Sequence, residues 1–214
     1  MCQAPWYPAG LHESGACLAA LQATHVRVLC VDHGAVLRSY RSRYVALARF
    51  APDLDLTVVA PRGLRELNYM GHVDHADVSE RGYQLEFATY RPAKAHRGFY
   101  GPFHLARLIR HFKPDIIHTQ GEPEALSSGE ICLLRDALSP RTVFAFVSWS
   151  NIDVYRLGWP YRAGTVYNWC YRLVVKRADA ATVYCGDAAR ILRGNGFRGP
   201  IAPIPWGVDP AVWE

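Results

Sequence analysis

Two short segments of the chain carry side chains that could bind a polar ligand. Glu122 and Glu124 lie close together in one segment, and Ser148, Trp149 and Asn151 follow an apolar run further along. Carboxylates accept hydrogen bonds from sugar hydroxyls and can serve as a general acid or base. An indole ring stacks on a polar ring such as a sugar, while an amide hydrogen-bonds it. We therefore predict a sugar-binding role for these residues.

Both segments also have a purely structural interpretation. The two glutamates could stabilise the N-terminus of the following helix, where the helix dipole favours negative charge. Asn151 or Asp153 could begin a helix, with Trp149 in the core. The sequence leaves both interpretations open.

A third candidate segment, Asp32–Ser39, follows the first apolar run, where many α/β proteins bind an anion. It holds a single glycine, Gly34, so the G-x-G-x-x-G fingerprint of nicotinamide dinucleotide sites is missing. One glycine still lets a phosphate approach the backbone, and Arg38, Arg41 and Arg43 add positive charge just beyond it. The alternative is an ordinary tight turn with a solvated basic helix face.

Residues 91–114 are basic and contain no acidic side chain. Leu105, Leu108, Ile109 and Phe112 recur at helical spacing, so they should face the core and leave a basic outer face. That face could contact anionic lipid headgroups or an anionic acceptor, or it could simply be solvated. Its interleaved aromatic residues also fit single-stranded nucleic acid. No recognisable RNA-binding motif accompanies them, so we predict no nucleic-acid partner.

No motif for a metal or a nucleophile stands out. The segment His72–Asp77 offers histidines and aspartates, but no third ligand cluster accompanies it, so we predict no metal site. A G-x-S-x-G motif and a Walker motif are both missing from the sequence. The six cysteines are scattered without a C-x-x-C, and we expect buried free thiols in a reducing cytosol.

The composition is that of a chain able to bury a core. Its 214 residues are 50% hydrophobic and 12% aromatic, which excludes a disordered or fibrous protein. The net charge of +5 is mild for a nucleic-acid-binding protein. No apolar run approaches the roughly 18 residues of a membrane-spanning helix. Residues 1–24 lack the pattern of a signal peptide, and we expect a loose extension ahead of the first strand.

Strand-like and helix-like segments alternate from residue 25 onward, with a long loop over 62–82. Alternation of this kind predicts an α/β protein with a Rossmann-like, doubly wound, mostly parallel sheet. We expect one domain over residues 25–214, with ligands at the carboxyl ends of the strands. In the helix predicted over 162–176, Val166, Trp169, Cys170 and Leu173 should face inward. The predicted strands are 25–31, 54–60, 83–90, 115–119, 142–147, 180–185 and 201–205, and the other predicted helices are 37–51, 105–112, 125–138 and 187–193.

The order of several motifs resembles the amino-terminal half of family-4 glycosyltransferases of the GT-B fold. The resemblance covers the chain from about Val26 to its end, and its most specific segments are Lys176–Ala180 and Ile204–Asp209. The other matching segments are Lys113–Gln120, Glu122–Glu124, Thr142–Phe144, Trp149–Ile152 and Gly199–Ile201.

The resemblance implies a two-domain enzyme in which the amino-terminal domain mainly binds the acceptor and the second domain binds a nucleotide-sugar. Family members transfer the sugar with retention at the anomeric carbon, usually without a bound metal, so the nucleotide-sugar is a co-substrate and no bound cofactor is expected. The loop with Gly34 and Arg38 would approach the donor diphosphate. The two glutamates and the segment Ser148–Asn151 would face the acceptor and the transferred sugar.

Two departures from the family pattern shape the expectation. Many members carry a histidine after the fifth strand, where this chain has Trp149, so no catalytic residue is assigned. The chain also ends at Glu214, where the family's second domain would begin. We therefore expect the acceptor-binding half of a retaining glycosyltransferase, needing a separate donor domain for activity. Its acceptor would be a glycan or a lipid-linked acceptor, and its location the cytoplasm or the periphery of the inner membrane face.

Two other functions compete with this expectation. The chain could be a non-catalytic binding or scaffold module, or a truncated fragment of such an enzyme, that contacts an anionic membrane through the basic face of residues 91–113. It could also be another nucleotide-dependent enzyme, such as an epimerase or a dehydrogenase. The missing glycine fingerprint disfavours that second alternative.

Overall fold

A computed structural model describes residues 25–62, 82–91 and 98–205 of the chain. Several sequence-based expectations lie outside these ranges. They are the extension over 1–24 with Cys2 and Cys17, most of the loop over 62–82 with His72–Asp77, the part of the basic segment over 92–97, and the end of the Ile204–Asp209 motif.

The described residues form an eight-stranded sheet in the order β4-β3-β2-β1-β5-β6-β7-β8. All neighbouring strands are parallel except β3 and β4. The predicted α/β, Rossmann-like, mostly parallel sheet is therefore confirmed. The strands are β1 (Val26–Val31), β2 (Leu54–Arg62), β3 (Gln84–Arg91), β4 (Phe99–Tyr100), β5 (Ile116–Thr119), β6 (Val143–Ser148), β7 (Ala180–Val183) and β8 (Ile201–Pro203).

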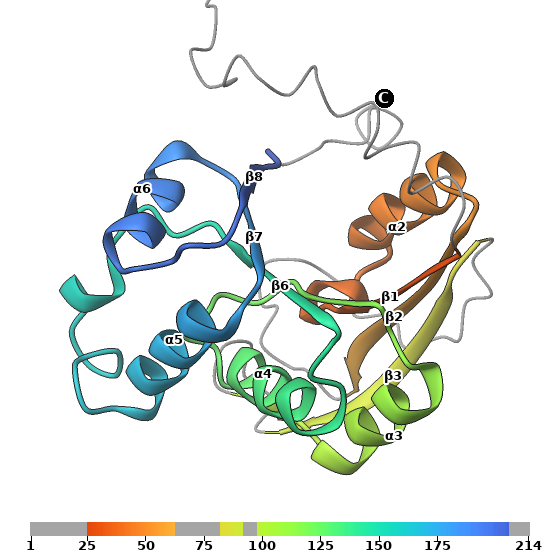
Figure 1. The fold of residues 1–214 in the computed structure, drawn as a ribbon, viewed down its shortest axis with the longest axis horizontal. Coiled ribbons are helices and arrows are strands. Elements are labelled where there is room, and N and C mark those ends of the chain that lie inside the picture. Colours follow the sequence, from red (N-terminus) through yellow and green to blue (C-terminus); the bar gives the residue numbers. More distant parts are fainter. Residues whose placement is uncertain (1–24, 63–81, 92–97, 206–214) are drawn as a thin grey trace, which may run out of the picture.

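Helices cover both faces of this sheet (Figure 1). Helix α2 lies on one face, while α3, α4 and α5 lie side by side on the other face, with α6 next to α5. The α-helices are α2 (Arg38–Phe50), α3 (Pro102–Phe112), α4 (Leu126–Leu138), α5 (Val166–Arg177) and α6 (Gly186–Gly194), and two short 3-10 helices are η2 (His33–Val36) and η3 (Val154–Arg156).

The central strands are apolar because helices cover them on both sides. Leu29 of β1, Val58 of β2 and Ile117 of β5 have no exposed surface. Helix α3 ends at Phe112, as predicted, but begins at Pro102, three residues before the predicted start. Pro102 begins it, where a missing N–H costs nothing, and Lys113 ends it in the left-handed conformation at φ 49°.

Helix α5 corrects one sequence-based prediction. Cys170 is buried, as predicted, and Leu173 is partly buried against the core, but Val166 and Trp169 are 52% and 50% exposed. The helix instead turns Cys170 toward α4, where Gly129 leaves room for the thiol. Its other buried positions, Asn168, Tyr171, Val174 and Val175, extend around the helix away from the predicted stripe.

Strand β4 has no counterpart among the predicted elements. It has only two residues, and it pairs antiparallel with the end of β3. A buried contact holds it, since the Tyr100 N–H donates to Glu130 Oε2 of α4 at 2.7 Å. A side chain from a distant helix is not visible in local sequence patterning, so this strand could not be predicted from its own residues.

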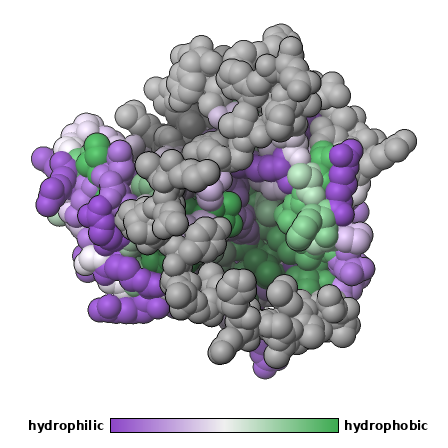
Figure 2. Space-filling view, turned by 90° about the horizontal axis from the view of Figure 1, so that it is seen from above, coloured by the Kyte–Doolittle hydropathy of each residue, from purple (hydrophilic) through white to green (hydrophobic). Residues whose placement is uncertain are grey.

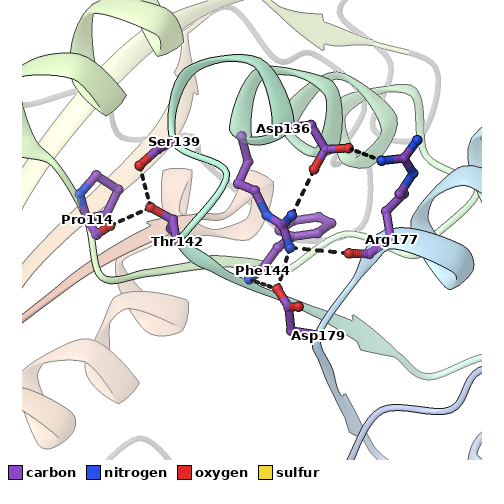
Figure 3. Close-up of polar contacts among 8 residues, drawn as sticks. Pro114, Asp136, Ser139, Thr142, Phe144, Arg177 and Asp179 are labelled. Atoms are coloured by element: carbon purple, nitrogen blue, oxygen red, sulfur yellow. Dashed lines mark hydrogen bonds and ion pairs between the residues drawn. The ribbon is translucent and has the colours of Figure 1, made fainter.

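A network of charged and polar side chains clamps the amino ends of β6 and β7 (Figure 3). Arg135 of α4 is buried, and its guanidinium contacts Asp179, Asp136 and the Arg177 carbonyl oxygen. Asp179 also accepts the Phe144 N–H at 2.9 Å. The motif Lys176–Ala180 therefore has a structural role at the edge of the sheet opposite the carboxyl ends.

The surface is divided between two kinds of residue. Seen from above, hydrophobic residues gather in a hollow on the side that carries α2, while the opposite end, which carries α6, is mostly hydrophilic (Figure 2). No helix in the described ranges is long and apolar enough to cross a bilayer.

Candidate functional site

The strand order reverses at β1, which pairs with β2 on one side and with β5 on the other. Ligands bind at such a reversal in α/β proteins, because the loops leaving the two central strands separate there. Residues that follow four strands meet at this edge. They are Asp32 and His33 after β1, Gln120–Glu124 after β5, Ser148 and Trp149 at the end of β6, and Tyr184 after β7.

Contacts between these loops bring the candidate residues together. The Trp149 N–H donates to Glu122 Oε1 at 2.8 Å. The Trp149 ring stacks on Tyr184 with 5.9 Å between centroids and 11° between planes. The Trp149 and His33 rings meet in an edge-to-face arrangement, with 6.3 Å between centroids and 60° between planes. The structure therefore places Glu122 and Trp149, predicted from separate segments, in one cluster.

Glu122 is a buried acid, only 2% exposed. Its second oxygen, Oε2, has no hydrogen-bond partner among the described residues. Burial, and then the nearby Glu124 carboxyl, raise the pKa of Glu122 to about 8, and hydrogen bonding by the Trp149 N–H, the Ser148 side chain and the Ser150 N–H offsets this only in part. Burial also raises the pKa of Glu124. A carboxyl that keeps its proton near neutral pH can donate a hydrogen bond as well as accept one.

The loop after β1 is built around Asp32 rather than around an open anion site. The Asp32 carboxylate accepts the Gly34 N–H and the Tyr44 hydroxyl, each at 2.8 Å, and forms an ion pair with Arg43. Gly34 itself is buried. The first turn thus already holds its own carboxylate, with Arg43 as the counter-charge.

Arg43 extends this network across the sheet. Its guanidinium lies 5.1 Å from the Tyr44 ring centroid and reaches Gln120 Oε1 at 3.5 Å. Gln120 in turn contacts His118 Nδ1 at 3.2 Å. Burial, and then the charge of Arg43, lower the pKa of His118 to about 4, so this histidine is neutral near pH 7. The network therefore ties the ends of β1 and β5 together.

The remaining predicted residues occupy several environments. Ser148 is buried at the end of β6, and Glu124 is buried beside Glu122. Asn151 is exposed two residues beyond Trp149. Arg38 is the first residue of α2. The expected solvated basic face of α2 is not what forms, because Arg41 is fully buried and Arg43 turns toward Asp32.

Sequence reasoning included Asp32 and Arg43 in the candidate anion segment but did not foresee their ion pair, and it did not single out Tyr184. A usable signal existed for Tyr184, since it lies near the end of a predicted strand, where the ends of parallel strands meet. The pairing of Arg43 with Asp32 had no such signal. Arg43 lies one helical turn and a half into α2, and only the fold turns it toward the strands.

A family comparison decides the identity of this fold. Residues 45–212 match the sequence model of Glycosyltransferase Family 4, which is well over half of the chain. The chain belongs to Glycosyltransferase Family 4. None of the curated proteins matches it significantly.

Solved structures add a likeness in fold to this family-4 domain. The UDP-GlcNAc 2-epimerase from Neisseria meningitidis, solved bound to UDP-GlcNAc, superposes with a TM-score of 0.53 at 13% identity, over 83% of this chain and 46% of its own. A putative UDP-N-acetylglucosamine 2-epimerase from Listeria monocytogenes gives 0.51 at 14% identity, over 81% and 43%. The family-4 domain described here thus spans less than half the length of each.

Proposed function

We propose that this chain is the acceptor-binding domain of a retaining, nucleotide-sugar-dependent glycosyltransferase, and that a donor-binding domain completes its active site. The observation that carries the proposal is the cluster of Glu122, Trp149, Tyr184 and His33 at the strand-order reversal. Membership of the family supplies the reaction class. Stacked rings beside a buried acid suit a sugar, which presents C–H groups to the rings and hydroxyls to the carboxyl.

The residue roles follow from the same cluster. Glu122, through its unpartnered Oε2, would hydrogen-bond an acceptor hydroxyl. Trp149 would stack on the acceptor or on the transferred sugar, with Ser148, Glu124 and Asn151 contributing polar contacts. Gly34 and Arg38 keep their proposed place beside the donor diphosphate. Because the Gly34 N–H is bonded to Asp32, we propose that a diphosphate there would be held by other donors than this amide.

The proposed reaction requires two domains for a geometric reason. A sugar transfer needs donor and acceptor held within near-attack distance. This domain would supply the acceptor and the donor domain the nucleotide-sugar. We propose a glycan or lipid-linked acceptor and a cytoplasmic location. The likeness to epimerases concerns the fold, since the identities are 13% and 14%.

Saturation-transfer NMR on the full chain tests the proposal, using a panel of methyl glycosides and, separately, nucleotide-sugars. We expect a subset of glycosides to receive saturation, and the Trp149→Ala variant to lose most of that signal. Trp169→Ala, which removes an exposed ring on α5, is the matched control and should bind like the original chain. Addition of a family-4 donor domain should then yield a transfer product with the anomeric configuration of the donor.

The proposal fails if no glycoside binds and no donor domain supports transfer. It also fails if the Trp149→Ala and Trp169→Ala variants bind glycosides equally well. An inverted anomeric configuration in the product would refute the retaining mechanism.

A further inference from the structure

One stretch of the chain carries several positive charges and no acidic side chain of its own. Residues 154–177, which include η3 and α5, contain five Lys or Arg residues and no Asp or Glu. Arg177 pairs with Asp136. The other four, Arg156, Arg162, Arg172 and Lys176, make no ion pair with any residue in the described ranges. Such charges remain available to an outside partner.

Large apolar side chains lie exposed in the same stretch. Trp159 is 77% exposed, Val166 is 52% exposed and Trp169 is 50% exposed. Tryptophan is usually well buried, so two rings left in water within one short stretch need an explanation. Arg162 lies over the Trp159 ring, with 5.7 Å from its guanidinium carbon to the ring centroid. Aromatic and cationic groups are therefore intermixed on this surface.

The helix geometry aligns three of these residues. Trp169, Arg172 and Lys176 follow at spacings of three and four, so they share the outer side of α5. Cys170 and Val174 occupy the buried side. We call Trp159, Val166, Trp169, Arg172 and Lys176 the α5 surface. The loop before α5 and α5 itself lie at the same end of the molecule, away from α2 (Figure 1).

A hollow next to the α5 surface adds a pocket for an anionic group. Arg172, Lys176 and Arg198 line it together with Asn195, and its volume is about 400 Å³. None of its lining residues is acidic. A phosphate group could thus approach three cations at once, each of which can donate hydrogen bonds to its oxygens.

We propose that the α5 surface binds an anionic lipid bilayer peripherally. Tryptophan is the side chain that most favours the membrane–water interface, and arginine and lysine beside it attract anionic headgroups. Single-stranded nucleic acid would use the same cations, but Val166 offers a base no stacking surface and suits the edge of the acyl region instead. The inference does not depend on the proposed sugar transfer, because the α5 surface shares no residue with the Trp149 cluster.

Vesicle co-sedimentation of the full chain tests the proposal, with phosphatidylcholine vesicles and with vesicles that also contain phosphatidylglycerol. We expect binding to the anionic vesicles only. Arg172→Gln with Lys176→Gln should weaken partitioning about 30-fold, because each basic residue at an anionic surface contributes roughly a factor of five. The matched control is Arg107→Gln with Arg110→Gln, which removes the same charge from the exposed side of α3.

A second measurement identifies the inserted rings. Brominated phosphatidylglycerol should quench tryptophan fluorescence in the original chain, and Trp159→Ala with Trp169→Ala should abolish that quenching. Circular dichroism of each variant establishes that it is folded before binding is compared.

Three outcomes would overturn the proposal. The first is an absence of binding to anionic vesicles. The second is an equal loss of binding in the α3 control, which would assign the contact to the basic face of residues 91–113 or to net charge. The third is binding of a single-stranded oligonucleotide in place of vesicles.

Discussion

Glu122 shows how one side chain can serve both the fold and a ligand. Its Oε1 fixes the backbone of the loop after β6 through the Trp149 N–H, which sets the position of the indole ring. Its Oε2 stays unbonded in the described structure. Neither role requires charge, and a buried carboxyl beside a second one is most stable when it keeps its proton.

The two roles predict different results for two substitutions of Glu122. Glu122→Ala leaves the Trp149 N–H without its acceptor and should lower the free energy of unfolding by about 1–3 kcal/mol. Glu122→Gln keeps an acceptor oxygen and should cost less than about 1 kcal/mol at pH 6. Urea unfolding of both variants measures the difference. Equal losses of stability would show that the hydrogen bond to Trp149 contributes nothing.

Helix α4 contacts and positions three strands and the neighbouring helix α5. Its Arg135 clamps β6 and β7 at their amino ends, its Glu130 holds β4, and its Gly129 admits α5. Asp115 makes a related contact at the neighbouring strand, since it accepts the Arg27 N–H of β1 at 2.9 Å. The acidic residues of two family motifs, Asp115 and Asp179, thus cap strand amides at the edge opposite the candidate site.

The contact between α4 and α5 gives a prediction at this scale. A methyl group at position 129 would lie 2.6 Å from Cys170 Sγ, so Gly129→Ala should cost about 1–3 kcal/mol of unfolding free energy through overpacking. Adding Cys170→Ala removes the sulfur and should recover part of that loss. Gly194→Ala is the control, because it is also helical and nothing lies within 4 Å of its added methyl. Thermal or urea unfolding would refute the idea if both glycine variants behaved alike.

At the scale of elements, sequence patterning was sufficient for most of the fold. The helices predicted over 37–51 and 105–112 end just before Pro52 and Pro114, and the apolar runs locate the parallel strands, since these features depend on local chemistry. The prediction that Trp169 faces inward was wrong, because the side of α5 that is buried depends on the shape of α4. The meeting of Glu122 with Trp149 followed from the rule for strand ends, whereas Arg43 depends on tertiary packing alone.

Buried groups that act in opposite senses should set how the stability of the whole molecule depends on pH. Burial raises the pKa of Glu130 to about 8, and the pKa values of Glu122 and Glu124 are raised too. At pH values between their usual pKa and these raised pKa values, the carboxyls hold protons in the folded chain but not in the unfolded chain. The free energy of unfolding therefore falls as the pH rises toward 8. Burial lowers the pKa of His118 to about 4, so the contribution of this histidine to stability falls as pH drops below about 6.5, where the unfolded chain takes up a proton there. It offsets part of the stability that the three carboxyls gain over the same range.

This balance predicts that the free energy of unfolding falls between pH 6.5 and 8 by at least about 1 kcal/mol per pH unit, since one fully coupled proton contributes about 1.4. Urea unfolding across that range measures the slope. Glu130→Gln should make it shallower, because the variant has no proton to lose. Asp53→Asn, at an exposed carboxyl, should leave it unchanged. A flat profile in the original chain would contradict the burial of these acids.

The central place of β1 also governs the order in which the chain can assemble on the ribosome. Val28–Val31 need partners from both Leu56–Val59 and Ile116–Thr119, and the second set is synthesised almost ninety residues later. Until then the emerging β1–β2–β3 unit presents one long apolar border with nothing beside it. Such non-local pairing slows folding and leaves nascent chains prone to aggregation. Nascent-chain chaperones that cover apolar segments would therefore be needed most while residues 60 to 115 are being added.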